Sequence, residues 1–340
     1  MIKKAVIASV LAGIGLSASV ASFAQGELNI YSARHYQTDE ALYGGFTEQT
    51  GIKVNRIEAR EDELLERIRN EGANSPADIL ITVDASRLAN ADQMGIFAPI
   101  KSAVLEERIP DHLRADNWIA FSTRARVIIY NPELVQAEQV QTYESLADPA
   151  LKGKVCTRSG SHPYNLSLGA ALIKHHSAEK AEEWARGIVA NFARAPKGGD
   201  TDQIRAVAAG ECGVAIANSY YFARLMNSDR PEDQQVVEAV RFVWPNQDSF
   251  GTHINISGAG VLKHAPNKEA AVKFLEYLAS DDAQRYFADG NNEWPAASNV
   301  KVNNPALDKL GEFKADTLPI GELANAVAEA QRIYDRAGYR

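Results

Sequence analysis

The sequence predicts an α/β protein built from two lobes with a ligand cleft between them. Strand and helix patterns alternate from residue 27 to residue 95, which is typical of a layered α/β domain. The alternation restarts after residue 150, and two long extended segments, near residues 121–130 and 240–262, separate the alternating blocks. We therefore expect two crossover strands between the lobes. Ligands of such sheets bind at the carboxyl ends of the strands and between lobes.

In the first block, each predicted strand is followed by an amphipathic helix. Residues 27–33 alternate between polar and apolar side chains, and residues 76–84 form a nearly continuous apolar run that suits a buried parallel strand. The helices have apolar residues at helical spacing, and Gly51 is a stop signal. The predicted elements are strand 27–33, helix 38–51, strand 52–59, helix 62–72, strand 76–84 and helix 85–95.

The second block begins with a long strand that runs from Trp118 to Asn131-Pro132. The later predicted elements are a helix, turn and strand in 144–157, a helix from near Asn165, a helix at 181–192, a helix, strand and helix in 200–226, an extended segment at 241–265, and helices at 267–280, 281–290 and 320–338. The expected division is residues 25–122 plus 248–298 for lobe 1 and 123–247 plus 299–340 for lobe 2.

Residues 1–24 are predicted to be a cleavable signal peptide. A basic start (MIKK) precedes an apolar run over residues 5–20, and residues 22–24 (SFA) fit a small-x-small cleavage site. The apolar run is shorter than the ~18 residues of a membrane span, which argues against a retained anchor. We therefore expect a periplasmic protein. Cleavage changes the formal net charge from −8 to −10, and this acidic balance argues against nucleic acid as a partner. We also expect the protein to be a monomer.

Two cysteines, Cys156 and Cys212, are present. In an exported protein an even pair predicts one disulfide, and two free buried thiols are the alternative. Two cysteines are too few for a metal-thiolate site.

The usual enzyme signatures are absent. The sequence has no G-x-x-x-x-G-K-[ST] loop, no H-E-x-x-H, no G-x-S-x-G and no G-x-G-x-x-G. The GAG at residues 258–260 lies inside a predicted strand, where we interpret it as a packing feature. We therefore expect a solute receptor and not an enzyme.

Tyrosines follow several predicted strands, at the turn into the next helix. His35 and Tyr36 follow strand 27–33, Tyr164 follows the GKVC strand, and Tyr220 and Tyr221 follow the strand at residues 212–218. Ser219 is the expected cap of the helix that begins there. These turns belong to both lobes, so we expect the side chains to face the cleft.

Clustered phenols suit a particular kind of cation. A phenol has a pKa of ~10 and ionises at neutral pH only when a cation displaces its proton. Phenolate oxygen is a hard donor that suits a hard, highly charged ion such as ferric iron, whereas calcium or magnesium would require carboxylates. Four phenolates around a trivalent ion leave one negative charge, which a nearby arginine could offset. The candidates are Arg34, Arg126, Arg158 and Arg224.

The order SARHYQTDEAL, GSHPYNLSLGA and GVAIANSYYFARL is similar to that of the periplasmic ferric-ion-binding proteins of bacterial iron ABC transporters. The resemblance covers essentially the whole mature chain and is closest to the subgroup with a His-Tyr pair near the N-terminus. It implies a type II periplasmic-binding-protein fold, iron in the interlobe cleft and delivery to an inner-membrane ABC permease. It also implies that Tyr36, Tyr164, Tyr220 and Tyr221 are ligands, with His35 as a candidate fifth.

Other interpretations stay open. His35 either ligates the metal or makes a hydrogen bond beside it, and ferrous iron is an alternative to ferric. The same fold could instead bind an organic cation or an anionic small solute, through aromatic stacking or arginine clamps. Tyr277 and Tyr286 lie at helical spacing among apolar residues and are expected in the core.

Overall fold

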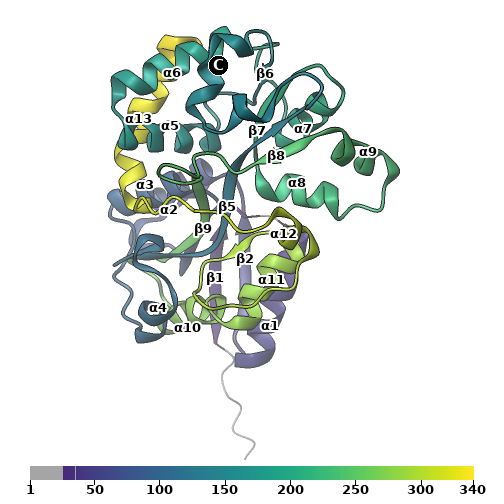
Figure 1. Ribbon diagram of the computed structural model, residues 1–340. Helices are drawn as coiled ribbons and strands as arrows, with labels where there is room; N and C mark the ends of the chain where they lie inside the picture. Colours follow the sequence, from purple (N-terminus) through teal and green to yellow (C-terminus); the bar gives the residue numbers. More distant parts are fainter. Residues whose placement is uncertain (1–25, 35) are drawn as a thin grey trace, which may run out of the picture.

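The computed structural model describes residues 26–34 and 36–340, so the predicted signal peptide and His35 lie outside the described residues. The strands are β1 (Glu27–Ser32), β2 (Lys53–Glu58), β3 (Ile79–Thr82), β4 (Arg114–Ala115), β5 (Trp118–Tyr130), β6 (Val155–Cys156), β7 (Val214–Asn218), β8 (Arg241–Val243), β9 (Ile254–Val261) and β10 (Trp294–Pro295). They form one sheet in the order β2-β1-β3-β9-β5-β7-β6, with β4, β8 and β10 pairing to β5 outside this path. Figure 1 shows β5 and β9 running through the middle of the molecule.

Strand β5 belongs to both halves of the sheet. Its first part, from Trp118 to Ala125, pairs antiparallel with β9, and its second part, from Arg126 to Tyr130, pairs antiparallel with β7. Beyond β9 lie β3, β1 and β2, whereas β7 pairs in parallel with β6. Every residue of β5 is buried, as expected for a strand covered on both faces. The second extended segment returns from β8, which pairs with the second part of β5, to β9, which pairs with its first part. The α/β fold with two crossovers is therefore confirmed, and the limits of the two lobes remain a prediction.

The helices cover both faces of this sheet (Figure 1). They are α1 (Glu40–Thr50), α2 (Glu61–Glu71), α3 (Ala85–Gln93), α4 (Ala103–Arg108), α5 (Pro163–His175), α6 (Ala178–Ala190), α7 (Asp200–Ala208), α8 (Ser219–Met226), α9 (Pro231–Ala239), α10 (Lys268–Leu278), α11 (Asp281–Asn291), α12 (Pro305–Leu310) and α13 (Ile320–Ala337). Helix α13 contacts α5 and α6 in one half and α3 in the other. Within residues 26–34 and 36–340, no helix has both the length and the apolar character needed to cross a membrane.

The structure differs from the predicted elements in a few places. Helix α5 begins at Pro163, two residues before the predicted start, because Pro163 occupies its first turn and His162 caps it. Ser219 is not the cap of α8. Asn218 holds that position, and the Ser219 hydroxyl accepts a hydrogen bond from the Ala125 N–H. The extended segment at 241–265 is divided into β8 and β9, and the short helices α4, α9 and α12 were not predicted.

The predicted disulfide is confirmed. Cys156 at the end of β6 and Cys212 before β7 are bonded, with their Cα atoms 5.8 Å apart. The two cysteines are 56 positions apart in the sequence, and the segment between them contains α5, α6 and α7. The bond therefore links the chain just before β7, the strand that leads to Tyr220, to β6.

The GAG at residues 258–260 is confirmed as a packing feature. A Cβ on Gly258 would lie 2.4 Å from Leu88 Cδ2 and 2.8 Å from the carbonyl oxygen of Ile119, and a Cβ on Gly260 would lie 2.6 Å from the ring of Phe97. These glycines let β9 approach its neighbours closely.

Gly258→Ala is expected to destabilise the protein by about 1–3 kcal/mol, because a backbone carbonyl cannot move away from the added methyl as a side chain could. The measurement is the urea dependence of the free energy of unfolding. Gly321→Ala in α13 is the control, because a Cβ there meets nothing within 4 Å. An equal effect of the two substitutions would contradict the packing account.

Candidate metal centre

Tyr36 lies where β1 leads into the first helical turns. After Ser32 the chain leaves the strand, and the Arg34 N–H donates to the Ser32 hydroxyl (3.0 Å). Arg34 is fully buried, and its guanidinium carbon lies 4.7 Å from the ring centroid of Tyr36. The Tyr36 side chain is half-buried, at the carboxyl end of a parallel strand.

Tyr164 and the Tyr220-Tyr221 pair lie in the first turns of two helices in the other half. Tyr164 is the second residue of α5, and its N–H donates to His162 Nδ1 (3.2 Å). Tyr220 and Tyr221 are the second and third residues of α8, one residue after the end of β7, and their ring centroids are 4.3 Å apart. The hydroxyl oxygens of Tyr164 and Tyr220 are hydrogen-bonded at 3.1 Å, so phenols separated by 56 residues meet at one point.

The four tyrosines influence one another electrostatically. Burial raises the pKa of the Tyr164 hydroxyl well above its usual range, and negative charge on Tyr36 or Tyr221 raises it further, while Arg124 opposes the rise. Burial likewise raises the pKa of Tyr220, with added contributions from Tyr164, Tyr36 and Tyr221. Without a cation these buried phenols therefore keep their protons, and a cation must displace the protons to bind.

The structure thus brings together the four predicted tyrosines. The fifth candidate, His35, is outside the described residues. Within the described part of the chain, no group of three or more histidine, cysteine, aspartate or glutamate side chains could hold a metal ion. The phenol oxygens of the four tyrosines are hard donors, and such a set suits a hard trivalent ion.

The predicted arginines all lie beside these rings. The guanidinium carbons of Arg126 and Arg158 are 5.8 and 5.1 Å from the ring centroid of Tyr164. The guanidinium carbon of Arg224 is 5.9 and 5.7 Å from the ring centroids of Tyr220 and Tyr221, although Arg224 itself is exposed.

A further arginine, Arg124, was not predicted. It is fully buried on β5, with its guanidinium carbon 6.0 Å from the ring centroid of Tyr220. Its Nη2 donates to Ser257 Oγ (2.9 Å), whereas Nε and Nη1 have no hydrogen-bond partner among the described residues. The sequence did contain a signal for Arg124. This arginine lies two positions before the predicted Arg126 in an apolar strand, and residues i and i+2 of a strand share one face.

Buried carboxylates hold these arginines in place. Glu293 lies 2.9 Å from Arg34 Nη2 and 3.3 Å from Arg124 Nη2, and Asp39 Oδ2 accepts from Arg34 Nε (2.6 Å). In the other half, Asp200 accepts from Arg126 (2.6 Å) and Arg158 (3.1 Å). Burial opposes ionisation of Asp200 and Glu293, but the neighbouring arginines outweigh it and hold the pKa of both carboxyls below the usual range.

The charges around the tyrosines nearly cancel. Solvent screens the charge of the exposed Arg224. The buried and partly buried fixed charges are those of four arginines and three carboxylates, namely Arg34, Arg124, Arg126, Arg158, Asp39, Asp200 and Glu293. One positive charge is left in excess. Ionising all four phenols would bring this group to three negative charges, which a trivalent cation neutralises and a divalent cation does not. Because uncompensated buried charge is costly, the surroundings favour a trivalent ion.

A cavity of about 590 Å³ adjoins this site, between Glu58–Asp62 and Arg87 on one side and His162 and Pro163 on the other. Glu61 lines it with a side chain only 10% exposed, and its Oε1 has no hydrogen-bond partner in the described part of the chain. Burial raises the pKa of Glu61 from 4.5 to about 8, with the charge of Asp84 adding to the rise and Arg87 opposing it.

This carboxyl predicts a pH dependence of stability. Between pH 4.5 and about pH 8 the folded protein holds a proton on Glu61 that the unfolded chain has lost. The contribution is fully present below pH 4.5 and falls as the pH rises, by up to ~1.4 kcal/mol per pH unit. Glu61→Gln lacks this titration, so in urea unfolding from pH 5 to pH 8 the stability of the wild type should fall relative to that of the variant, and the two curves should separate as the pH rises. Parallel curves would contradict the assignment.

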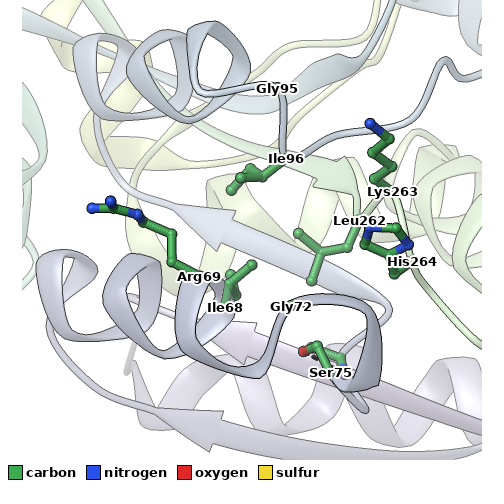
Figure 2. Close-up of a pocket in the computed structure, with 10 residues that line it drawn as sticks. Ile68, Arg69, Gly72, Ser75, Gly95, Ile96, Leu262, Lys263 and His264 are labelled. Atoms are coloured by element: carbon green, nitrogen blue, oxygen red, sulfur yellow. Dashed lines mark hydrogen bonds between the residues drawn. The ribbon is translucent and has the colours of Figure 1, made fainter.

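A second cavity, of about 200 Å³, lies between the end of α2, the residues after α3 and the residues after β9, and none of the four tyrosines lines it. Figure 2 shows Ile68, Ile96 and Leu262 around it, with Lys263 and His264 nearby. Its lining is largely apolar and offers no phenol, so it is not a part of the tyrosine cluster.

Known proteins resemble this chain over almost its whole length. A family model described as bacterial extracellular solute-binding protein matches residues 74–311. Iron uptake protein A1 of Synechocystis sp. is 49% identical over 318 residues, which cover 93% of this chain and 88% of that protein.

Solved structures give the same picture. A Trichodesmium protein in complex with iron and citrate superposes with a TM-score of 0.88 at 51% identity, covering 93% of this chain and all of that chain. The ferric binding protein from Campylobacter jejuni superposes with a TM-score of 0.86 at 43% identity, covering 92% of this chain and all of that chain.

Proposed function

The chain belongs to the family of bacterial extracellular solute-binding proteins, and we propose that it captures ferric iron through the phenolates of Tyr36, Tyr164, Tyr220 and Tyr221. The observation that carries the proposal is the 3.1 Å separation of the Tyr164 and Tyr220 hydroxyl oxygens, with Tyr36 and Tyr221 close enough to affect their pKa. The iron-binding names of the similar proteins support it independently.

The division of the ligands between two lobes suggests the binding sequence. Tyr164, Tyr220 and Tyr221 belong to the proposed lobe 2 (residues 123–247 plus 299–340), and Tyr36 belongs to lobe 1 (25–122 plus 248–298). Iron would first meet the three phenolates of lobe 2. Closure of the lobes would then add Tyr36, so binding would stabilise the closed form.

Release would reverse the proton exchange that accompanies binding. Protons compete with iron for phenol oxygens of high pKa, so acidification favours release. Reduction to ferrous iron would leave one uncompensated negative charge in the buried site, which also weakens binding. We propose a periplasmic location and an inner-membrane ABC permease as the receiving partner, both on the basis of family membership.

A second candidate ligand is an anionic small solute. The observation that favours it is the set of buried guanidinium nitrogens without a partner in the described residues, on Arg124, Arg126 and Arg158. Such a solute would bind to the arginines without needing the tyrosine oxygens to ionise.

Visible absorption distinguishes the two candidates. Protein stripped of metal and then loaded with ferric ion should develop a phenolate-to-iron charge-transfer band that fades on acidification or on addition of dithionite. Iron content after desalting should approach one atom per chain. A colourless protein without bound iron after loading would contradict the proposal and leave the anionic solute.

A further inference from the structure

Tyr339 is buried beside the loop that presents Tyr164. After α13, Gly338 adopts a left-handed conformation (φ 78°) and turns the chain back, and the Tyr339 N–H donates to the Tyr334 carbonyl (2.9 Å). The Tyr339 side chain is 1% exposed. Its hydroxyl is hydrogen-bonded to Thr157 Oγ1 (2.7 Å) and accepts from Asn165 Nδ2 (3.0 Å).

Asn165 connects this hydroxyl to the rest of the loop. Its Nδ2 also donates to the carbonyls of Arg158 (3.1 Å) and Ser159 (3.0 Å), and its Oδ1 accepts from Arg126 Nη2 (2.7 Å). Its own carbonyl accepts from the Tyr334 hydroxyl (2.9 Å). Asn165 is therefore held by both C-terminal tyrosines, and it follows Tyr164 directly in the sequence.

The loop backbone also lies against Tyr339. A Cβ on Gly160 would be 2.3 Å from the Tyr339 carbonyl oxygen and 2.8 Å from its ring, so the loop approaches the C-terminus as closely as a glycine permits. Tyr339 thus fixes residues 157–165 through two hydrogen bonds of its hydroxyl and through direct backbone contact.

We propose that Tyr339 is a positioning residue for iron binding, acting through Thr157 and Asn165 on the loop that presents Tyr164; this rests on the proposed iron-binding function. It is not itself a ligand, because its hydroxyl is occupied by Thr157 and Asn165. The hydroxyl keeps Asn165 in place, and Asn165 in turn holds the start of α5 and the guanidinium of Arg126, which lies 5.8 Å from the Tyr164 ring centroid.

Tyr339→Phe tests this, because it keeps the ring and removes only the hydroxyl. The matched control is Tyr277→Phe, a half-buried tyrosine on α10 whose hydroxyl has none of these contacts. In ferric-loaded protein, Tyr339→Phe should speed iron removal by excess EDTA at least about tenfold, because it removes both hydrogen bonds of the hydroxyl to buried partners. It should also move the charge-transfer band, and Tyr277→Phe should do neither. Unchanged removal rate and band would overturn the proposal.

A second readout does not depend on iron. In metal-free protein, amide hydrogen exchange within residues 157–165 should be faster in Tyr339→Phe than in wild type, with no change around α10. Unchanged exchange in that loop would overturn the positioning role even if the wild type bound no iron. A colourless wild type with faster loop exchange in the variant would refute iron binding alone.

Thr157→Val provides a variant that approaches the same hydrogen bond from its other side. It should also make exchange in the loop faster, and the effect of the double variant should be smaller than the sum of the two single effects, because both single changes remove the Tyr339–Thr157 hydrogen bond. Strictly additive effects would show that the two groups act separately, which would also overturn the proposal.

Discussion

Replacing Tyr220 and Tyr221 together by phenylalanine is expected to abolish tight iron binding. Sites with four protein ligands bind metal with ~10–16 kcal/mol, or about 3 kcal/mol per ligand, so the loss of two ligands should weaken binding by at least about 10⁴-fold. The rings remain, so the packing of α8 is kept. The measurement is competition against a chelator of known ferric affinity.

Tyr286→Phe is the control for this experiment, because Tyr286 is a half-buried tyrosine of α11. It should bind iron as the wild type does. If the double variant retains wild-type affinity, the assignment of Tyr220 and Tyr221 as ligands is wrong, whatever the control shows.

Asp200→Asn is expected to destabilise the metal-free protein by about 3–5 kcal/mol, because the change leaves the buried Arg126 and the partly buried Arg158 without their counter-charge. Asp200 is fully buried, and it also accepts from the Asn218 N–H (2.7 Å) at the end of β7. The measurement is the free energy of unfolding in urea. The matched control is Asp62→Asn, which breaks an exposed pair with Arg60 and should cost less than about 1 kcal/mol.

The same substitution tests the charge argument. With Asp200 neutral, the ionised site would carry two negative charges in place of three, which matches a divalent ion. The reduction potential of bound iron should therefore rise in Asp200→Asn relative to wild type. An unchanged or lower potential would contradict the view that the buried carboxylates help to select a trivalent ion.

Local signals were enough to predict where the tyrosines lie. Each follows a strand and begins a helix, and strand-to-helix turns at the carboxyl ends of a sheet converge at one edge. The alternation of elements also gave the α/β fold, and the export signal gave the reason to expect the bond between Cys156 and Cys212. These features depend on residues that are neighbours in the sequence.

The surroundings of the tyrosines could not be predicted in the same way. Glu293 is separated from Arg124 by 169 positions, so nothing local identifies the two as partners, and the same holds for Tyr339 and Thr157. Ser219 was assigned to capping from local preference. The antiparallel pairing of β5 with β7 brings the Ala125 N–H to its hydroxyl instead. Tertiary contacts decided each of these cases.

A crystal structure of ferric-loaded protein, with anomalous scattering recorded at the iron edge, tests the central claim most directly. The account predicts one iron atom bonded to the hydroxyl oxygens of Tyr36, Tyr164, Tyr220 and Tyr221. An iron atom bound elsewhere, or bound with fewer than three of these oxygens, would contradict it.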